Sequence, residues 1–293
     1  MSTFIAAAIS GIALGFLLGL LGFGIVILYK ATGVANFAQG AIGTLGAFLV
    51  AKIGALTGLG ILPSLAIGIV VAAMVGVLMY YCFFRYNDEI GAFNLTIRTL
   101  GVELLILALI NAKWAEGQPF PFPAVFPNAT SFQFGDTVVS WLTLGSILTA
   151  ALLTGAFVYI FNRTDIGLQF IAIAERPQIA RMLGVRTRRL VLLSWVVAAV
   201  IALVVGALLA PVALLSSEMM EPYMLLGFTA VVIGGLTSLS GVFIGGIIVG
   251  VVNNVAALYL SSDVAVLIVF CLLMVTLRFR PNGLLVKAVA ERL

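Results

Sequence analysis

Few side chains in this sequence can do chemistry, and two of them stand together in the run Asn36-Phe37-Ala38-Gln39-Gly40, between two apolar stretches. Primary amides bind small polar solutes through hydrogen bonds, and they are costly to expose to lipid. We therefore predict that the run faces protein or a water-filled route, as part of a discontinuous helix. An ordinary turn, which favours the same residue types, is the alternative.

A single carboxylate, Glu103, lies inside the apolar stretch TLGVELLILAL at 99–109. An ionisable residue within such a stretch marks a functional site by default. Arg98 precedes it by a helical rotation of about 140°, so the two side chains do not share a helix face. Glu103 is therefore either a residue of a route through the membrane or a structural carboxyl group that is protonated or paired elsewhere.

The third polar feature is the segment 172–189, AIAERPQIARMLGVRTRR, which is strongly basic. Glu175 and Pro177 suit a first helical turn, and Gly184 suits a helix C-terminus. Between them, Ile179, Met182 and Leu183 form one apolar strip. The pattern predicts a short amphipathic helix that rests on the membrane surface or inserts into a cytoplasmic partner.

The composition shows which elements must carry these residues. The chain is 63% hydrophobic and 9% charged, and it contains no histidine. Its mean hydropathy is +1.25. Soluble domains carry roughly 25% charged residues, so lipid must cover most of this chain. We read the net charge of +4 as loop bias rather than as a nucleic-acid footprint.

The same inventory argues against a metal centre or an enzymatic role. Cys82 and Cys271 lie in separate apolar stretches without metal-ligand or disulfide spacing, so we expect no cofactor. The chain lacks the Gly-x-x-x-x-Gly-Lys-Ser/Thr phosphate loop, and we therefore expect it not to hydrolyse ATP itself.

The fold class that follows is an all-α, polytopic membrane protein. A spanning helix needs about 20 apolar residues. We predict about nine spans, with eight as the alternative because three candidates are short. The candidates are 5–28, 40–56, 61–84, 93–111, 138–161, 190–213, 224–239, 241–260 and 263–277.

Positive residues predict the orientation of these spans. No Lys or Arg precedes the first apolar run, so we expect no cleavable signal peptide and an outside N-terminus. Lys30 and the arginines of 172–189 then lie in the cytoplasm, while the loops 112–137 and 214–223 face outward. The C-terminus lies inside because of four further positive residues: Arg278, Arg280, Lys287 and Arg292.

The span order also predicts an inverted repeat within one permease-like domain, 1–293. Residues 5–111 and 190–277 form the two halves, and 172–189 lies between them. Glycines spaced by four occur at Gly11, Gly15 and Gly19 and again at 241/245 and 246/250. This spacing favours close helix packing within the chain, with a subunit interface as the alternative.

Several motifs resemble one family along essentially the whole chain. AERPQIARMLGV at 174–185 is similar to the coupling helix of ABC-importer permeases. TGVANFAQGAIGTLGAFL at 32–49 and TLGVELLI at 99–106 resemble the second and fourth spans of branched-chain amino acid permeases. The C-terminal pattern continues in AVVIGGLTSLSGVFIGGIIVGVVNN at 230–254, YLSS at 259–262 and FRPNGLL at 279–285. The chain is identified as a member of the LivH-type, shorter permease subunits of the branched-chain (hydrophobic) amino acid ABC transporter family.

The resemblance implies a bacterial inner-membrane importer with a second, LivM-like permease, two cytoplasmic ATPases and a periplasmic binding protein. It implies that Asn36, Phe37, Gln39 and Gly40 border the translocation pathway, to which we add Glu103. The residues that it implies for docking into an ATPase are Ala174, Glu175, Arg176, Ala180, Arg181 and Gly184.

The chain departs from the family pattern in two places. It has FRYNDEIGAF at 84–93 instead of a basic, Pro-containing loop, and it carries Arg98 and Glu103 where small or uncharged residues are usual. Urea, a short amide or another small acid therefore stays open as the substrate. A secondary transporter that uses Glu103 and a non-transporting membrane scaffold are the competing functions.

Overall fold

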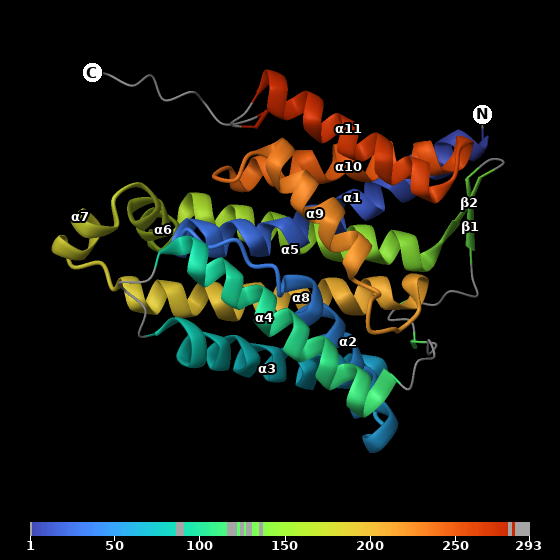
Figure 1. Cartoon of the computed structure of the whole chain (residues 1–293). Coiled ribbons are helices and arrows are strands. Elements are labelled where there is room, and N and C mark those ends of the chain that lie inside the picture. The colour runs from blue at the N-terminus through green and yellow to red at the C-terminus, as the bar shows by residue number, and fades with distance from the viewer. Residues whose placement is uncertain are drawn as a thin grey trace. The chain divides into compact units, whose positions relative to one another are not determined.

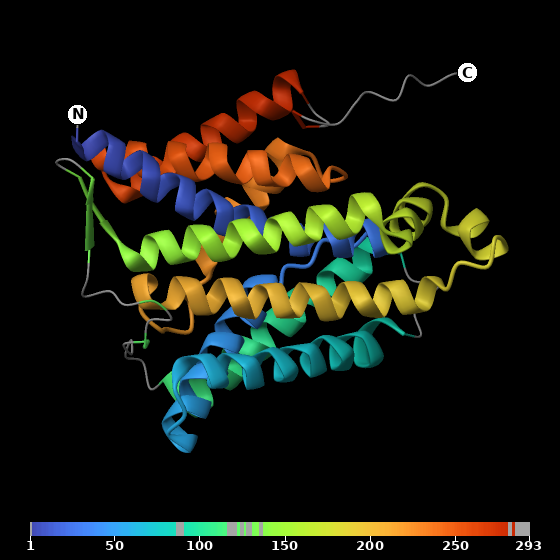
Figure 2. The ribbon, with the colours of Figure 1, turned by 180° about the vertical axis from the view of Figure 1, so that it is seen from behind.

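Long apolar runs with few turn residues form helices, because only a helix satisfies every backbone polar group without water. The computed structural model describes residues 2–85, 91–115, 122–123, 126, 131–134, 137–280 and 283–284. These residues are almost entirely helical, which confirms the predicted fold class (Figure 1; Figure 2). Lys287 and Arg292, which we assigned to the cytoplasmic side, lie outside the described residues.

The elements follow the predicted stretches closely. The helices are α1 (Ser2–Thr32), α2 (Gln39–Thr57), α3 (Ile61–Met79), α4 (Ala92–Ile110), α5 (Trp141–Arg163), α6 (Asp165–Glu175), α7 (Pro177–Met182), α8 (Thr187–Ala213), α9 (Glu221–Gly234), α10 (Leu239–Tyr259) and α11 (Ser262–Phe279). The π-helical turns η1 (Tyr80–Phe84) and η2 (Asn111–Ala115) follow α3 and α4. An antiparallel hairpin of β1 (Ser131–Phe134) and β2 (Thr137–Ser140), which we did not predict, precedes α5.

Eight of the described helices are long and apolar enough to cross a membrane: α1 to α5, α8, α10 and α11. The predicted span 224–239 differs, because α9 has only 14 residues. Such a helix is about 21 Å long, whereas the hydrocarbon core is about 30 Å thick. The chain turns at Gly235, whose φ is +106°, and Ser238 then caps α10 by accepting a hydrogen bond from the Gly241 N–H at 3.0 Å.

The helices belong to two compact units, and neither coincides with a predicted sequence half. One unit comprises Met1–Val26, Ala129–Val158 and Leu225–Leu293, and the other comprises Ile27–Asn128 and Tyr159–Met224. Each unit therefore draws helices from both halves of the sequence. Because an inverted repeat concerns the equivalence of the halves and not their contacts, the repeat stays a prediction.

In the first unit, glycines bring two helix backbones into contact. A Cβ on Gly15 of α1 would lie 2.6 Å from the Cα of Ile247, and one on Gly246 of α10 would lie 2.5 Å from the Gly15 carbonyl oxygen. Gly11 and Gly250 meet in the same way one turn further along. The glycines spaced by four thus pack within the chain, as the favoured interpretation predicted.

In the second unit, α2 lies against α3, α4 and α8. Its core surrounds Trp195 of α8, which is 1% exposed and clusters with Ile42 of α2, Tyr80 after α3 and Val102 of α4. α6 and α7 lie at one end of this unit, and the junction of α2 with α3 lies at the other (Figure 1; Figure 2). The unit therefore joins the two predicted functional segments through its core.

Candidate functional site

Residues 33–38 connect α1 to α2 and are not helical. α1 ends where Gly33 adopts a φ of +72°, a conformation that only glycine enters readily. The Thr32 hydroxyl accepts a hydrogen bond from the Val34 N–H at 3.1 Å and donates one to the Leu28 carbonyl at 2.7 Å. α2 begins at Gln39, so residues 33–38 form a non-helical connection between two long helices, and the discontinuous helix stays a prediction.

The segment starts at the exposed Gly33, and its other end, at the start of α2, lies deep in the unit. The Gln39 side chain of α2 donates a hydrogen bond from Nε2 to the carbonyl of Ala198, at 2.8 Å. Ala198 lies about 16 Å along α8 from Thr187, at about 1.5 Å per residue. Gln39 is fully buried, as is Ala38 before it. The start of α2 is therefore enclosed by protein, as the amide-rich run predicted.

Asn36 and Gln39 form one buried amide pair. Both side chains are 0% exposed, and Asn36 Nδ2 donates to Gln39 Oε1 at 3.0 Å. The other polar atom of Asn36, the acceptor Oδ1, has no hydrogen-bond partner among the described residues. An unsatisfied buried acceptor costs about 1–3 kcal/mol, so its persistence in the fold calls for an explanation.

Thr99 of α4 is a site residue that our sequence reasoning missed. Its hydroxyl accepts a hydrogen bond from the Phe37 N–H at 3.1 Å and donates to the Thr96 carbonyl at 2.7 Å. Thr99 is 0% exposed, while Phe37 is half-buried. The available signal was a threonine at the start of TLGVELLI, a motif that we quoted without assigning its hydroxyl a role.

Two methionines cover the glycine face at the start of α2. A Cβ on Gly40 would lie 3.3 Å from Met224 Cβ, and one on Gly43 would lie 3.3 Å from Met220 Cε. Met220 and Met224 are 1% and 6% exposed. The loop 214–223, which we expected to face outward, is thus partly buried, and among its members Glu218 and Glu221 stay exposed.

Glu103 lies near this cluster, one helical turn beyond Thr99 on α4. Its side chain is half-buried, between the core residue Val102 and the exposed Leu104. Glu221, at the start of α9, is close enough to interact with it electrostatically. The structure therefore places Glu103 at the edge of the buried cluster and not within it.

The basic segment 172–189 contains the end of α6, all of α7 and the start of α8. Ala174 and Glu175 end α6, and Pro177 begins α7. Between them, Arg176 adopts φ −146° and ψ 84°, because a residue that precedes proline is excluded from the helical conformation. The prediction that Glu175 belongs to the first turn of the α7 helix was wrong for this reason.

The end of α7 forms a Schellman motif. Gly184 has a φ of +83°, its N–H donates to Arg181 O at 3.1 Å, and the Val185 N–H donates to Ala180 O at 3.0 Å. Gly184 thus ends the helix as the sequence indicated. Three residues after Gly184 the chain enters α8, so the motif determines the direction of α7 relative to the long helix.

α7 presents apolar side chains to its surroundings. Met182, Leu183 and Ile179 are 86%, 78% and 44% exposed, whereas Ala180 is only 2% exposed and faces the protein. A surface hollow of about 490 Å³ lies beside α7, lined in part by Leu183, Gly184 and residues of α6 and α8. Ala180 is therefore a packing residue, whereas the strip of Ile179, Met182 and Leu183 is exposed.

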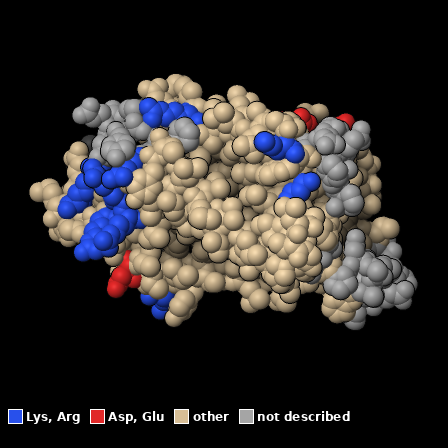
Figure 3. All heavy atoms as spheres, turned by 90° about the horizontal axis from the view of Figure 1, so that it is seen from below, with Lys and Arg blue, Asp and Glu red and all other residues tan. Residues whose placement is uncertain are grey.

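Basic side chains flank the apolar tip of α7, which consists of Ile179, Met182 and Leu183. Figure 3 shows Lys and Arg gathered at the end of the view where α7 lies. Glu175 is close enough to Lys30, at the end of α1, to interact with it electrostatically. The end of α6 is thereby close to the helix end that leads into the segment 33–38. The exposed arginines of the segment are Arg176, Arg181, Arg186, Arg188 and Arg189.

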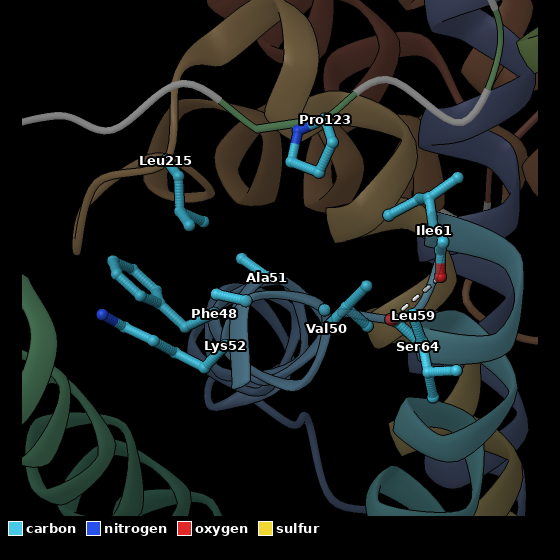
Figure 4. Close-up of a pocket in the computed structure, with 12 residues that line it drawn as sticks. Phe48, Val50, Ala51, Lys52, Leu59, Ile61, Ser64, Pro123 and Leu215 are labelled. Atoms are coloured by element: carbon cyan, nitrogen blue, oxygen red, sulfur yellow. Dashed lines mark hydrogen bonds between the residues drawn. The ribbon is translucent and has the colours of Figure 1, made fainter. Parts of the chain in front are cut away.

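A second hollow, of about 470 Å³, lies at the opposite end of α2 (Figure 4). Its lining is mainly apolar and includes Phe48, Ile61, Pro123 and Leu215, together with the charged Lys52. Ser64, on the α3 side, is occupied by a hydrogen bond to the Gly60 carbonyl at 3.0 Å. This hollow suits an apolar solute or side chain better than a strongly polar one.

Comparisons with known proteins agree with this architecture. Residues 7–277 match the family model described as "Branched-chain amino acid transport system / permease component". The chain is 29% identical over 255 residues to a probable branched-chain amino acid transport permease protein LivH of Methanocaldococcus jannaschii, covering 84% of this chain and 79% of that one. It is 25% identical over 307 residues to the high-affinity branched-chain amino acid permease protein LivH of Salmonella typhimurium, covering 99% and 97%.

A solved structure, PsaBC from Streptococcus pneumoniae in complex with Fab, has a similar fold. The match has a TM-score of 0.51 at 14% identity and covers 96% of this chain and 93% of that chain. At this identity, the likeness concerns the fold alone.

Proposed function

The chain belongs to the branched-chain amino acid transport permease family, and we propose that it is the membrane-spanning permease subunit of an ATP-driven importer for branched-chain, hydrophobic amino acids. Its relatives are transport permeases and not enzymes. ATP hydrolysis therefore belongs to separate ATPase subunits, and this chain supplies the route and converts their movement into access to either side of the membrane.

The observation that carries the proposal is the exposed apolar tip of α7 within a basic surround. Met182 and Leu183 are largely exposed, although α7 lies at the end of a unit whose other apolar side chains can pack or face lipid. Apolar anchors within a charged rim are typical of a protein interface. We assign this tip to a groove of the ATPase that is lined with acidic residues, with Arg176 and Arg181 at its rim.

The proposed coupling runs from this tip through α8 to the segment 33–38. α7 leads through Gly184 into α8, and α8 carries the Ala198 carbonyl that accepts the Gln39 hydrogen bond. A shift of α7 would be transmitted along the rigid α8 to the start of α2. A second connection runs through Glu175 and Lys30 to the end of α1. Alternating access in this proposal changes the packing of α2 against α8.

We assign the pathway to the interior of the second unit, along α2. Asn36, Phe37, Gln39 and Gly40 border it at mid-depth, and Glu103 lines its edge. The hollow beside Lys52 is its outer mouth, because the positive-inside rule places α7 in the cytoplasm and the far end of α2 outside. The remaining partners in the proposal are a LivM-like second permease, a second ATPase and a periplasmic binding protein that delivers the substrate at this mouth.

The experiment that tests the function uses the complex purified through this chain. We expect an ATPase to co-purify, and we expect leucine uptake into proteoliposomes to require ATP and the binding protein. Met182→Glu combined with Leu183→Glu should release the ATPase, because two buried carboxylates oppose the apolar contact. Leu56→Glu, at another highly exposed leucine (84%), is the matched control. Uptake that follows an ion gradient without any ATPase would refute the proposal.

A further inference from the structure

We propose that the start of α2 is a binding site for the zwitterionic head of an apolar α-amino acid, with Asn36 Oδ1 taking the ammonium group and the first backbone N–H groups of α2 taking the carboxylate. The proposal rests on the transport function proposed above and specifies its substrate. Its evidence is the set of hydrogen-bonding groups that this buried helix start leaves without a protein partner of the required kind.

The carboxylate half of the site is the N-terminus of α2. The first N–H groups of a helix have no partner within the helix and carry the positive end of its dipole. The N-cap residue of α2 is Ala38, whose side chain cannot accept a hydrogen bond from them. α2 is 19 residues long, and its first residues, Gln39, Gly40 and Ala41, are buried. A buried, uncapped N-terminus of this kind favours an anionic ligand.

The ammonium half of the site is the unsatisfied acceptor of Asn36. The amide cannot turn its Oδ1 to another partner, because its Nδ2 is held by Gln39 Oε1 at 3.0 Å and Gln39 is itself held by the Ala198 carbonyl at 2.8 Å. These two hydrogen bonds position Oδ1 beside the start of α2. A ligand that satisfies it must donate a hydrogen bond, as an ammonium group does.

The apolar half of the ligand meets the methionines. Gly40 and Gly43 carry no side chain, and Met224 and Met220 occupy the space above them. Methionine is unbranched and flexible, and its side chain adapts to apolar groups of different shape. When the ligand is bound, its aliphatic side chain lies against this pair in place of part of their present packing on the glycines.

These groups together distinguish between the candidate substrates. An α-amino acid carries a donor and an anion on adjacent atoms, and a branched side chain adds apolar surface. Urea and short amides lack the anion, and small carboxylic acids lack the ammonium group. Leaving one buried polar partner unmatched costs about 1–3 kcal/mol, which corresponds to roughly fivefold to 150-fold in affinity, and an unmatched charged group costs more.

The test is equilibrium binding of radiolabelled leucine to the complex in lipid nanodiscs, without the binding protein, so that selectivity reports on the permease. Two competitors each lack one charged group: 4-methylpentanoate has no ammonium group and 3-methylbutylamine has no carboxylate. We expect leucine itself to compete at least about tenfold better than either analogue. This comparison uses the unmodified chain and does not depend on the folding of any variant.

The role of Asn36 is tested by Asn36→Leu, with Asn94→Leu at an exposed asparagine of α4 as control. In Asn36→Leu the preference for leucine over 4-methylpentanoate should fall toward unity, while Asn94→Leu keeps it. Equal competition by all three compounds, leucine binding that requires Na⁺ as a ligand of Oδ1, or ATP-driven uptake without any leucine binding to the permease would each overturn the site. Absence of ATP-driven uptake in a complex that binds leucine selectively would instead refute the transport proposal and leave the site standing.

Discussion

At the scale of single residues, glycine determines how closely α2 and α8 approach. A Cβ on Gly43 would lie 2.9 Å from the Ala202 carbonyl oxygen, and the backbone of Gly206 on α8 lies against Gly43 in turn. The contact is between backbones, so no side-chain rotation can relieve an added methyl group. The hydrogen bond from Gln39 to Ala198 depends on the same close approach.

Gly43→Ala should therefore destabilise the chain by about 1–3 kcal/mol, the usual range for overpacking. Gly101→Ala is the matched control, because a Cβ at that position on α4 meets nothing within 4 Å. We expect a lower thermal unfolding midpoint for Gly43→Ala in detergent or nanodiscs and an unchanged or slightly higher one for Gly101→Ala. Equal midpoints for the two variants would mean that α2 and α8 separate more readily than the structure indicates.

A substitution at Glu103 tests whether this side chain lines the edge of the proposed pathway. If the carboxylate lines the route, Glu103→Gln should lower leucine uptake severalfold while ATP hydrolysis by the complex continues. Asp263→Asn, at the start of α11, is a comparable change at an exposed carboxylate, and it should leave uptake unaltered. The measurement is uptake and hydrolysis in the same proteoliposomes. If uptake by the unmodified complex collapses when the proton gradient is removed, Glu103 is instead an ion-coupling residue.

At the scale of elements, the direction of α7 is held by a single left-handed residue. Gly184, with a φ of +83°, closes the Schellman motif between α7 and α8. An L side chain in this conformation costs about 1–2 kcal/mol, and a β-branched one is the least tolerated. A change here alters the angle of α7 to α8 without touching the exposed strip.

Gly184→Val should consequently uncouple the transporter: ATP hydrolysis persists or falls modestly, while leucine uptake per ATP hydrolysed drops severalfold or more. Gly184→Asn is the matched control, since asparagine enters the left-handed region more readily than other non-glycine residues. The ratio of uptake to hydrolysis is the quantity to measure. A ratio that is unchanged in Gly184→Val would show that the orientation of α7 does not carry the coupling.

The elements also show how far the sequence can predict this structure. Span positions follow from composition alone, because lipid selects long apolar helices, and most predicted stretches match observed helices within a few residues. The break between α6 and α7 could also have been predicted, because Pro177 restricts the conformation of Arg176. We instead predicted that Glu175 belongs to the same helix as Pro177. The length of α9 could not be predicted, because it depends on the turn that begins at Gly235.

The contacts of the candidate site were less predictable than its residues. The sequence indicated that Asn36 and Gln39 are buried, because primary amides are costly to expose to lipid. It did not indicate the acceptor for Gln39, which is a backbone carbonyl that no sequence pattern marks. The same holds for Met220 and Met224, whose apolar character is compatible with lipid, core or pathway. Only the fold brings them to Gly40 and Gly43.

At the scale of the whole molecule, the predicted orientation assigns the two ends of the second unit to two aqueous compartments. Arginines surround α7, and the opposite end, around the α2–α3 junction, carries the hollow beside Lys52. The positive-inside rule assigns the first end to the cytoplasm and the second to the outside. The predicted inverted repeat of 5–111 and 190–277 concerns only the relative direction of the two halves, so the assignment of the ends rests on the positive residues.

Orientation is open to direct measurement through exposed positions. After Cys82 and Cys271, which are both exposed, are replaced by serine, single cysteines can be placed at Leu56 and at Met182, whose exposed fractions are 84% and 86%. In intact cells with a permeable outer layer, a membrane-impermeant thiol reagent should label Leu56→Cys and should reach Met182→Cys only after the inner membrane is opened. The chain is produced without the ATPase, which would otherwise cover Met182. The two positions then have nearly equal exposure, so a difference in labelling reports on the compartment and not on burial. Labelling of Met182→Cys from outside would contradict the predicted topology. The proposed ATPase contact would then lie outside the cell, and the proposed outer mouth would lie in the cytoplasm.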